Sequence, residues 1–355
     1  MAFGVAAKGI RGSLLWLVAF LGFLIAPLGQ AASPAPSYKV GMREVDWSDG
    51  ERPMAMTLFY PAEIADPATK PTVMPFFVNL QLYRDAPFVS GDKRYPLVML
   101  SHGRGSNGLV YAWFAEYLAS RGYIVAALNH YRANTYDSSI VYLTNKIWQR
   151  PLDIALDITW LMKDPAWSQH IDAGRIGVAG HSQGGFTSLW VGGAEVNPEL
   201  FTAYQRNWRN NLSIPQYLRD EMPVDAAPAL HLRDPRVKAA FAMAPGIIQA
   251  FGMDAQSLAK MAVPAYLIVG AADTQTPPAE NAAFAAKYIP QAELNIIPGR
   301  VDHEIFTNEC DQEGKDNFPE SCIDAPGVDR HQLHEMIGAA ALTFFDRNLD
   351  VQRPQ

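Results

Sequence analysis

The stretch Ile176-Gly-Val-Ala-Gly180-His-Ser182-Gln-Gly184-Gly-Phe decides the fold. Its apolar beginning predicts a buried strand, and the residues after Ser182 predict a helix. Between them, G-x-S-x-G is the pattern of a nucleophile elbow, a tight strand-to-helix turn that presents a serine hydroxyl. Side chains at Gly180 and Gly184 would collide with neighbouring chain in such a turn, which favours glycine at both positions. We therefore predict that Ser182 is a nucleophile.

On both sides of this motif, from Tyr95 onward, short apolar strands alternate with amphipathic helical stretches. This alternation is typical of βαβ units and of a largely parallel sheet. Two earlier β-rich runs look like antiparallel entry strands. We therefore predict an α/β fold with a mostly parallel central sheet flanked by helices. The expected strands cover residues 39–47, 54–60, 96–101, 124–128, 176–180, 239–244, 265–270 and 293–297, and the expected helices cover 110–120, 152–163, 183–191, 279–287 and 331–348.

The composition indicates a folded globular protein, because 49% of the residues are hydrophobic and 18% are charged. The net charge of -7 is accompanied by no basic run. Binding to nucleic acid requires a basic patch that neutralises phosphates, so nucleic acid is not an expected partner.

The first 32 residues have the layout of a secretory signal, in which Lys8 and Arg11 precede an apolar stretch over residues 14–28. That stretch is shorter than the roughly 20 residues that cross a bilayer, and small residues follow it. We expect cleavage after Ala31 and an exported protein, periplasmic or secreted, with no stable membrane span. An uncleaved N-terminal anchor is the alternative.

Residues 33–37 form a Pro/Ala/Ser linker, and no repeat or low-complexity stretch divides residues 38–355, which we expect to form a single domain. Within this domain, the alternation of strands and helices lapses over residues 195–234. This Pro- and Asn-rich stretch is too long for an ordinary connection. We interpret it as an irregular insertion that serves either as a lid over a site or as an edge decoration.

Export bears on the two cysteines, Cys310 and Cys322, because disulfides persist in an oxidising compartment. The residues between them are polar and typical of an exposed loop. We therefore predict a disulfide between the two, with a pair of unpaired buried thiols as the alternative.

A serine nucleophile needs a base, and a strand-turn-helix nucleophile expects the chain order Ser, then Asp or Glu, then His. His303 fits best, because it follows the last expected strand by six residues, on a loop. His331 and His334 fall on the terminal helix, where they are interpreted as surface or helix-face residues. His231 precedes the expected acid and breaks the order.

Asp273 is the expected acid, because it lies just after the apolar strand 265–270, where loops at carboxyl strand ends carry function. Asp302 and Glu304 are adjacent to His303, but neighbouring side chains on an extended loop diverge. The sequence therefore predicts a triad of Ser182, Asp273 and His303.

The loop Ser101-His102-Gly-Arg104-Gly, after an early central strand, predicts the second part of an oxyanion hole. The other part is the N-terminus of the helix after Ser182, whose free N–H groups and positive dipole end favour an anion. We propose the backbone N–H groups of Arg104 and Gln183 as the donors. His102 is interpreted as a structural histidine that fixes the loop.

The chain resembles the bacterial dienelactone-hydrolase-like proteins that are also similar to platelet-activating-factor acetylhydrolases, over residues 38–349. The resemblance rests on four motifs: Ser-His-Gly-Arg-Gly at 101–105, Arg-Pro-Leu-Asp at 150–153, Gly-His-Ser-Gln-Gly-Gly at 180–185, and Asp-Pro-Arg-Val-Lys-Ala-Ala from residue 234, before Ala-Pro-Gly. It implies one α/β-hydrolase domain that acts on small-molecule or lipid-like esters without a metal or organic cofactor. Dienelactone hydrolases proper use a cysteine nucleophile, so Ser182 points to a general esterase.

Two other readings stay open at this level. The same triad serves a serine peptidase or an acyltransferase, although the sequence offers no propeller domain that would gate peptides. A binding module on a degenerate hydrolase fold is a different class of protein, and it requires a triad that has been lost.

Overall fold

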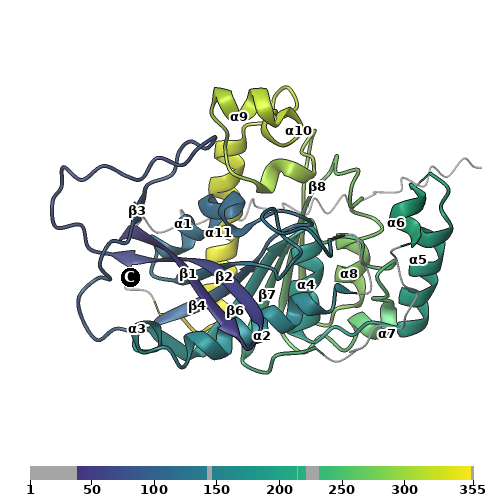
Figure 1. The fold of residues 1–355 in the computed structure, drawn as a ribbon, viewed down its shortest axis with the longest axis horizontal. Helices are drawn as coiled ribbons and strands as arrows, with labels where there is room; N and C mark the ends of the chain where they lie inside the picture. The colour runs from purple at the N-terminus through teal and green to yellow at the C-terminus, as the bar shows by residue number, and fades with distance from the viewer. Residues whose placement is uncertain (1–37, 142–145, 214, 221–231, 353–355) are drawn as a thin grey trace, which may run out of the picture. The chain divides into compact units, whose positions relative to one another are not determined.

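The computed structural model describes residues 38–141, 146–213, 215–220 and 232–352. The expected signal segment, the linker and His231 lie outside the described residues. One sheet of nine strands has the order β3-β1-β2-β5-β4-β6-β7-β8-β9 (Figure 1). The strands are β1 (Lys39–Asp49), β2 (Arg52–Ala62), β3 (Leu82–Arg84), β4 (Tyr95–Ser101), β5 (Ile124–Asn129), β6 (Ile171–His181), β7 (Val237–Met243), β8 (Ala265–Gly270) and β9 (Ala292–Ile297).

The pairing of the strands confirms the predicted α/β fold. β1 and β2 are antiparallel to each other, and β2 is antiparallel to β5. From β5 through β4, β6, β7, β8 and β9, all neighbours are parallel. The carboxyl ends of these parallel strands therefore meet at one edge of the sheet, where the loops that follow β4, β6 and β8 come together.

Helices cover both faces of the sheet (Figure 1). α1 and α11 pack on one face, and α2 and α4 pack on the other. None of the helices in the described part of the chain is long and apolar enough to span a membrane. The helices are α1 (Ala112–Ala119), α2 (Gln149–Leu161), α3 (Pro165–Ser168), α4 (Gln183–Gly192), α5 (Pro198–Asn210), α6 (Gln216–Asp220), α7 (Ala255–Leu258), α8 (Ala282–Tyr288), α9 (Gln312–Asn317), α10 (Pro319–Cys322) and α11 (Arg330–Asn348), with short 3-10 helices η1 (Gly108–Tyr111) and η3 (His303–Phe306).

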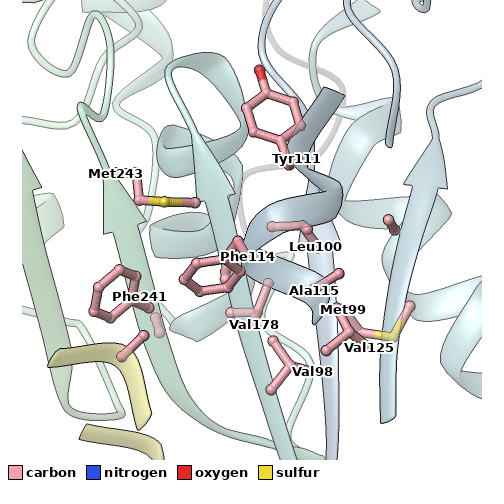
Figure 2. Close-up of a cluster of buried hydrophobic side chains, with 14 of the residues drawn as sticks. Val98, Met99, Leu100, Tyr111, Phe114, Ala115, Val125, Val178, Phe241 and Met243 are labelled. Atoms are coloured by element: carbon pink, nitrogen blue, oxygen red, sulfur yellow. The ribbon is translucent and has the colours of Figure 1, made fainter. Parts of the chain in front are cut away.

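An aromatic cluster packs between the sheet and the helices α1 and α11 that cover one of its faces (Figure 2). Phe241 of β7 is fully buried, and its ring centroid lies 5.8 Å from that of Phe114 on α1. The rings of Phe344 and Phe345 on α11 each lie 6.1 Å from Phe241. Burial of aromatic rings of this size is a large part of the energy of a core.

The structure corrects the prediction that residues 195–234 are irregular. This stretch contains α5 and α6. The side chain of Asn197 caps the first turn of α5, and Pro198 occupies a position that tolerates the missing N–H. Phe201, Tyr204 and Trp208 then follow at helical spacing, a stripe that the Pro and Asn content obscured. The polar segment between the cysteines, expected as an exposed loop, is mostly exposed but forms two short helices, α9 and α10.

Truncation of the central ring tests the core. We expect Phe241→Ala to lower the free energy of unfolding by about 3–5 kcal/mol, because it removes a buried ring and leaves a cavity that the surrounding side chains cannot fill. Phe318→Ala is the matched control, since that ring is 52% exposed, and it should cost far less. Chemical denaturation of both variants measures the difference, and equal losses would contradict this account of the core.

Candidate active site

Ser182 lies between β6 and α4 with a backbone that few non-glycine residues adopt, φ 55° and ψ -118°. Its N–H donates to the carbonyl of Met243 at 2.9 Å, and its carbonyl accepts from the N–H of Gly246 at 3.1 Å. These two bonds, to the last residue of β7 and to the loop that follows it, hold the residue in the strained conformation. Strain of this kind is costly and is found at sites where a side chain must be presented in a fixed direction.

The two glycines of the elbow are required by close backbone contacts. A Cβ at Gly180 would lie 2.3 Å from the carbonyl oxygen of Gly184. A Cβ at Gly184 would lie 1.9 Å from the carbonyl oxygen of Ser101, at the end of β4. Hydrogen is therefore the side chain that lets the start of α4 approach β4 this closely, as the sequence predicted.

Asp273 and His303 are hydrogen-bonded to each other. Asp273 Oδ2 lies 2.7 Å from His303 Nδ1, and the two residues are 3% and 4% exposed. The carboxylate also accepts from the N–H groups of Gln275 at 2.9 Å and Thr276 at 2.7 Å, and from the hydroxyl of Thr276 at 2.8 Å. Because Nδ1 faces a carboxylate, it carries the proton, which leaves Nε2 as the free acceptor of the ring.

The environment of Asp273 favours its charged form. Burial opposes ionisation, but the hydrogen bond and charge of His303 and the donors of Thr276 together hold the pKa of Asp273 below its ordinary value. The two neighbouring acids have other partners. Asp302 accepts from the N–H of Glu304 at 3.1 Å, and Glu304 accepts from the side chain of Gln275 at 3.0 Å.

His181, the variable residue before Ser182 in the motif, connects the loop after β4 to His303. The N–H of Gly103 donates to the hydroxyl of Tyr111 at 3.1 Å, and that hydroxyl lies 3.0 Å from His181 Nδ1. His181 Nε2 donates to the carbonyl of His303 at 3.0 Å. Burial and the neighbouring His303 hold the pKa of His181 well below its ordinary value, so the ring is neutral. The sequence pattern held no signal for this connection, because position 181 is free to vary in the motif.

Ser182 and the Asp273–His303 pair meet around Gly246. A Cβ built on Gly246 would lie 3.8 Å from Ser182 Oγ and 2.2 Å from the side chain of Thr276. The hydroxyl of Thr276 in turn lies 3.2 Å from His303 Nδ1. The structure therefore gathers the three predicted residues at one end of the sheet. A hydrogen bond from the Ser182 hydroxyl to Nε2 of His303 stays a prediction.

Ser182, Arg104 and Gln183 line one pocket. Tyr204 and Trp208 of α5 form part of its wall, so the insertion contributes side chains to the pocket rather than decorating an edge. The guanidinium of Arg104 lies 5.9 Å from the ring of Trp208, within the range of a cation–π contact. The rest of the lining mixes aromatic and aliphatic side chains with amides, hydroxyls and charged groups: Tyr131, Ala133, Ile140, Val141, Lys146, Ile147, Gln149, Arg150, Asp153, Gly246, Ile247, Phe251, Gln275 and Thr276.

The two histidines of the terminal helix have structural partners. His331 is exposed and pairs with Glu309 at 2.7 Å. His334 is 5% exposed, stacks on Trp113 with ring centroids 3.7 Å apart, and lies 2.9 Å from the carbonyl of Ile305. His334 is thus buried rather than a surface residue, because Trp113 covers it.

Cys310 and Cys322 form the predicted disulfide. The bond closes the segment that contains α9 and α10. This segment begins four residues after the end of η3 (His303–Phe306), in which His303 is the first residue. Across the described ranges, no group of three or more histidine, cysteine or acidic side chains is arranged to hold a metal ion.

Three comparisons with known proteins relate the chain to hydrolases. A family model described as platelet-activating factor acetylhydrolase, isoform II, matches residues 73–146. An uncharacterized peptidase of Bacillus subtilis (strain 168), YuxL, is 32% identical over 162 residues, which are 44% of this chain and 23% of that protein. The chain thus spans less than a quarter of that relative's length. A ferulic acid esterase from Streptomyces cinnamoneus has the same fold, with a TM-score of 0.62 and 22% identity over 91% of this chain and 96% of that one.

These findings agree with the resemblance drawn from the motifs. The matching family model covers the loop that carries Arg104, and the shared fold extends over nearly the whole chain. The chain has the α/β-hydrolase fold and is similar, over residues 73–146, to platelet-activating factor acetylhydrolase, isoform II.

The disulfide yields a stability prediction. We expect the double variant Cys310→Ser with Cys322→Ser to lower the free energy of unfolding by about 2–4 kcal/mol, because the unfolded chain loses a constraint. Denaturant titration measures the loss, and reductant should produce a similar loss in the unaltered chain but none in the variant. Detection of two free thiols in the non-reduced protein would contradict the bond.

Proposed function

We propose that this chain, an α/β-hydrolase similar to the platelet-activating factor acetylhydrolases, is a serine hydrolase that cleaves carboxylic esters through an acyl-enzyme at Ser182. The observation that carries the proposal is the positive φ of Ser182 at the turn from β6 to α4. A serine that served only packing would have no need of a conformation that costs about 1–3 kcal/mol. The buried pair of Asp273 and His303 adds the base that a serine nucleophile requires.

In the first half of the proposed reaction, Nε2 of His303 accepts the proton of Ser182 as Oγ attacks the ester carbonyl carbon. The carbonyl electrons move onto the oxygen, and the N–H groups of Arg104 and Gln183 donate to the resulting oxyanion. When the bond to the alcohol breaks, His303 returns the proton to the leaving oxygen, and the acyl group stays on Ser182. The ionised Asp273 stabilises the imidazolium that forms between these two transfers.

In the second half, water takes the place of the alcohol. His303 accepts a proton from water as the water oxygen attacks the acyl carbon, and a second oxyanion forms between the same donors. Its collapse releases the carboxylic acid and returns the proton to Ser182. No redox step or added cofactor is needed, because each proton taken up by His303 is given back.

The lining of the pocket supports a small-molecule or lipid-like ester as the substrate. Phe251 and Ile247 provide apolar contact beside Ser182, and Tyr204 and Trp208 add aromatic surface. Such a lining favours an acyl or alcohol group with an apolar part. Amide cleavage is the second candidate, because the relative from Bacillus subtilis is named a peptidase.

We also propose that the protein acts outside the cytosol, in the periplasm or as a secreted enzyme. The expected signal segment at residues 1–32 and the disulfide between Cys310 and Cys322 support this location. Sequencing of the N-terminus of the exported protein tests it, with Ala32 as the expected first residue. An intact Met1 would contradict cleavage.

The nucleophile is tested by Ser182→Ala. We expect turnover of p-nitrophenyl esters to fall by about 10⁴-fold or more, because the residual rate comes only from binding and oxyanion stabilisation. A fluorophosphonate probe should label the unaltered chain and fail to label this variant. Ser48→Ala, on the exposed part of β1, is the control and should keep both activity and labelling.

The same assay separates the candidate classes. An ester series of increasing acyl length, run beside matched amides, should show ester turnover that exceeds amide turnover at every length. Amide turnover above ester turnover would favour the peptidase. Absence of both labelling and turnover in the unaltered chain would favour a binding module and reject the proposed function.

A further inference from the structure

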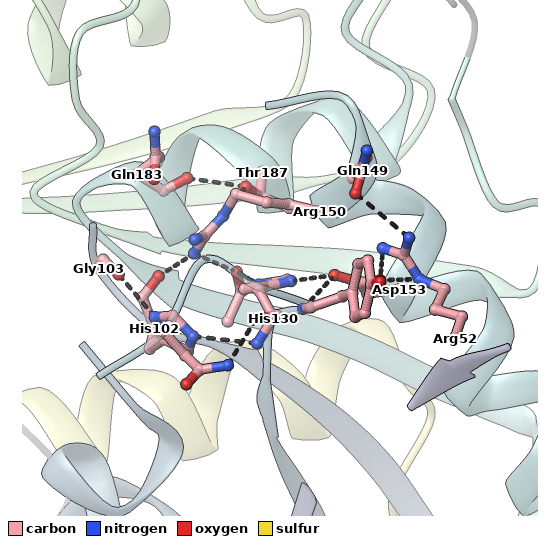
Figure 3. Close-up of polar contacts among 12 residues, drawn as sticks. Arg52, His102, Gly103, His130, Gln149, Arg150, Asp153, Gln183 and Thr187 are labelled. Atoms are coloured by element: carbon pink, nitrogen blue, oxygen red, sulfur yellow. Dashed lines mark hydrogen bonds and ion pairs between the residues drawn. The ribbon is translucent and has the colours of Figure 1, made fainter. Parts of the chain in front are cut away.

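We propose that Arg150 is a positioning residue that holds the two parts of the proposed oxyanion hole, the loop after β4 and the first turn of α4, in place relative to each other. Arg150 begins the buried face of α2 and is 2% exposed. Its guanidinium contacts the loop after β4, which carries Arg104, and α4, which carries Gln183 (Figure 3). The inference rests on the proposed function and assigns to this reaction a residue that lines the pocket of Ser182 and whose hydrogen bonds reach Ser101, His102 and Thr187.

On the side of the loop, Nη2 of Arg150 donates to the carbonyl of His102 and to the hydroxyl of Ser101, the latter at 3.3 Å. Ser101 is the last residue of β4, and its hydroxyl also lies 2.8 Å from Nε2 of His130. The guanidinium thus fixes the point at which the chain leaves the sheet and enters the loop.

His102 carries this constraint to the proposed donor. The backbone N–H of His130 donates to Nε2 of His102 at 3.2 Å, so Nε2 carries no proton. The proton is therefore on Nδ1, which donates to the carbonyl of Gly103 at 2.6 Å. That carbonyl belongs to the peptide unit whose N–H is that of Arg104, so the His102 ring sets the direction in which the N–H of Arg104 points.

On the side of the helix, Nε of Arg150 donates to the hydroxyl of Thr187 at 3.2 Å. The same hydroxyl donates to the carbonyl of Gln183 at 2.8 Å, in the first turn of α4. One planar group therefore restrains the peptide unit that carries the Arg104 N–H, through His102, and the peptide unit that directly follows the Gln183 N–H, through Thr187. Because a guanidinium has its donors in a fixed fork, it restrains both segments in one geometry.

In these contacts the charged guanidinium of Arg150 donates only to neutral oxygens, those of one carbonyl and two hydroxyls. The nearby Asp153 is bound instead by Arg52, by His130 at 3.0 Å and by the N–H of Tyr131 at 3.2 Å. Burial lowers the pKa of Arg150 to about 9, although Asp153 opposes the change, so the group stays charged at neutral pH. Burial of a charge with so little compensation costs stability, which favours a role beyond folding.

Two pairs of variants test the inference with p-nitrophenyl esters. Arg150→Met removes the bridge, and Arg150→Lys keeps the charge without the fork. Thr187→Val cuts only the link to Gln183 and preserves the shape, whereas Thr187→Ser keeps the hydroxyl. Arg121→Met is the matched control, because Arg121 is 8% exposed and also donates to a carbonyl and a hydroxyl.

We expect Arg150→Met and Thr187→Val to lower kcat by about 10- to 100-fold, because a misaligned donor loses part of its transition-state stabilisation. KM should stay within about twofold, since the ground state does not use the hole. Affinity for a trifluoromethyl ketone, which mimics the tetrahedral intermediate, should fall in proportion to kcat/KM. Thr187→Ser should restore most of kcat, and Arg150→Lys should restore less, because it lacks the fork.

The inference is overturned if folded Thr187→Val, with an unchanged melting temperature, keeps kcat and ketone affinity. It is also overturned if KM rises while kcat stays constant, or if Arg121→Met lowers kcat equally. If Arg150→Met does not fold, the kcat and ketone affinity of Thr187→Val decide whether the inference holds. An unaltered chain that turns over no ester and binds no ketone rejects the proposed function itself, and the inference with it.

Discussion

The first turn of α4 and the end of β4 are in backbone contact at Gly184 and Ser101, where a single added carbon would lie 1.9 Å from a carbonyl oxygen. This contact brings the turn that carries Ser182 beside the loop that carries Arg104. β4 and β6 are parallel neighbours, so both chain segments leave the sheet at the same edge. Without glycine at position 184, the two donors of the proposed oxyanion hole would be moved apart, and the nucleophile would lose its place between them.

Buried neutral histidines act as connectors around this contact. Burial holds the pKa of His102, His130 and His181 well below the ordinary value, so each ring offers one donor and one acceptor. His181 joins the loop after β4 to the backbone of His303, and His102 joins His130, the residue after β5, to the same loop. A neutral ring suits this use, because it can accept one hydrogen bond and donate another.

The sequence predicted the elements whose signals are local. Continuous apolar runs identified the parallel strands, and the glycines around Ser182 identified the turn. Chain order and strand ends selected Asp273 and His303, which the fold brings to a hydrogen bond of 2.7 Å across 30 residues. The helical stripe of α5 was missed because its Pro and Asn residues serve as a helix start and cap rather than as loop residues. The roles of Arg150, His181 and Thr276 have no local signal, since their partners are distant in the chain and are defined only by packing.

Trapping of the acyl-enzyme tests the central claim most directly. The unaltered protein would be mixed with a p-nitrophenyl ester, quenched in acid within the first turnover, digested and analysed by mass spectrometry. The account predicts the acyl mass on the peptide that contains Ser182, with an amount that matches the burst of p-nitrophenol, and no such adduct in His303→Ala. An acyl group on another residue, or turnover with substrate in excess that shows neither an adduct nor a burst, would contradict the account.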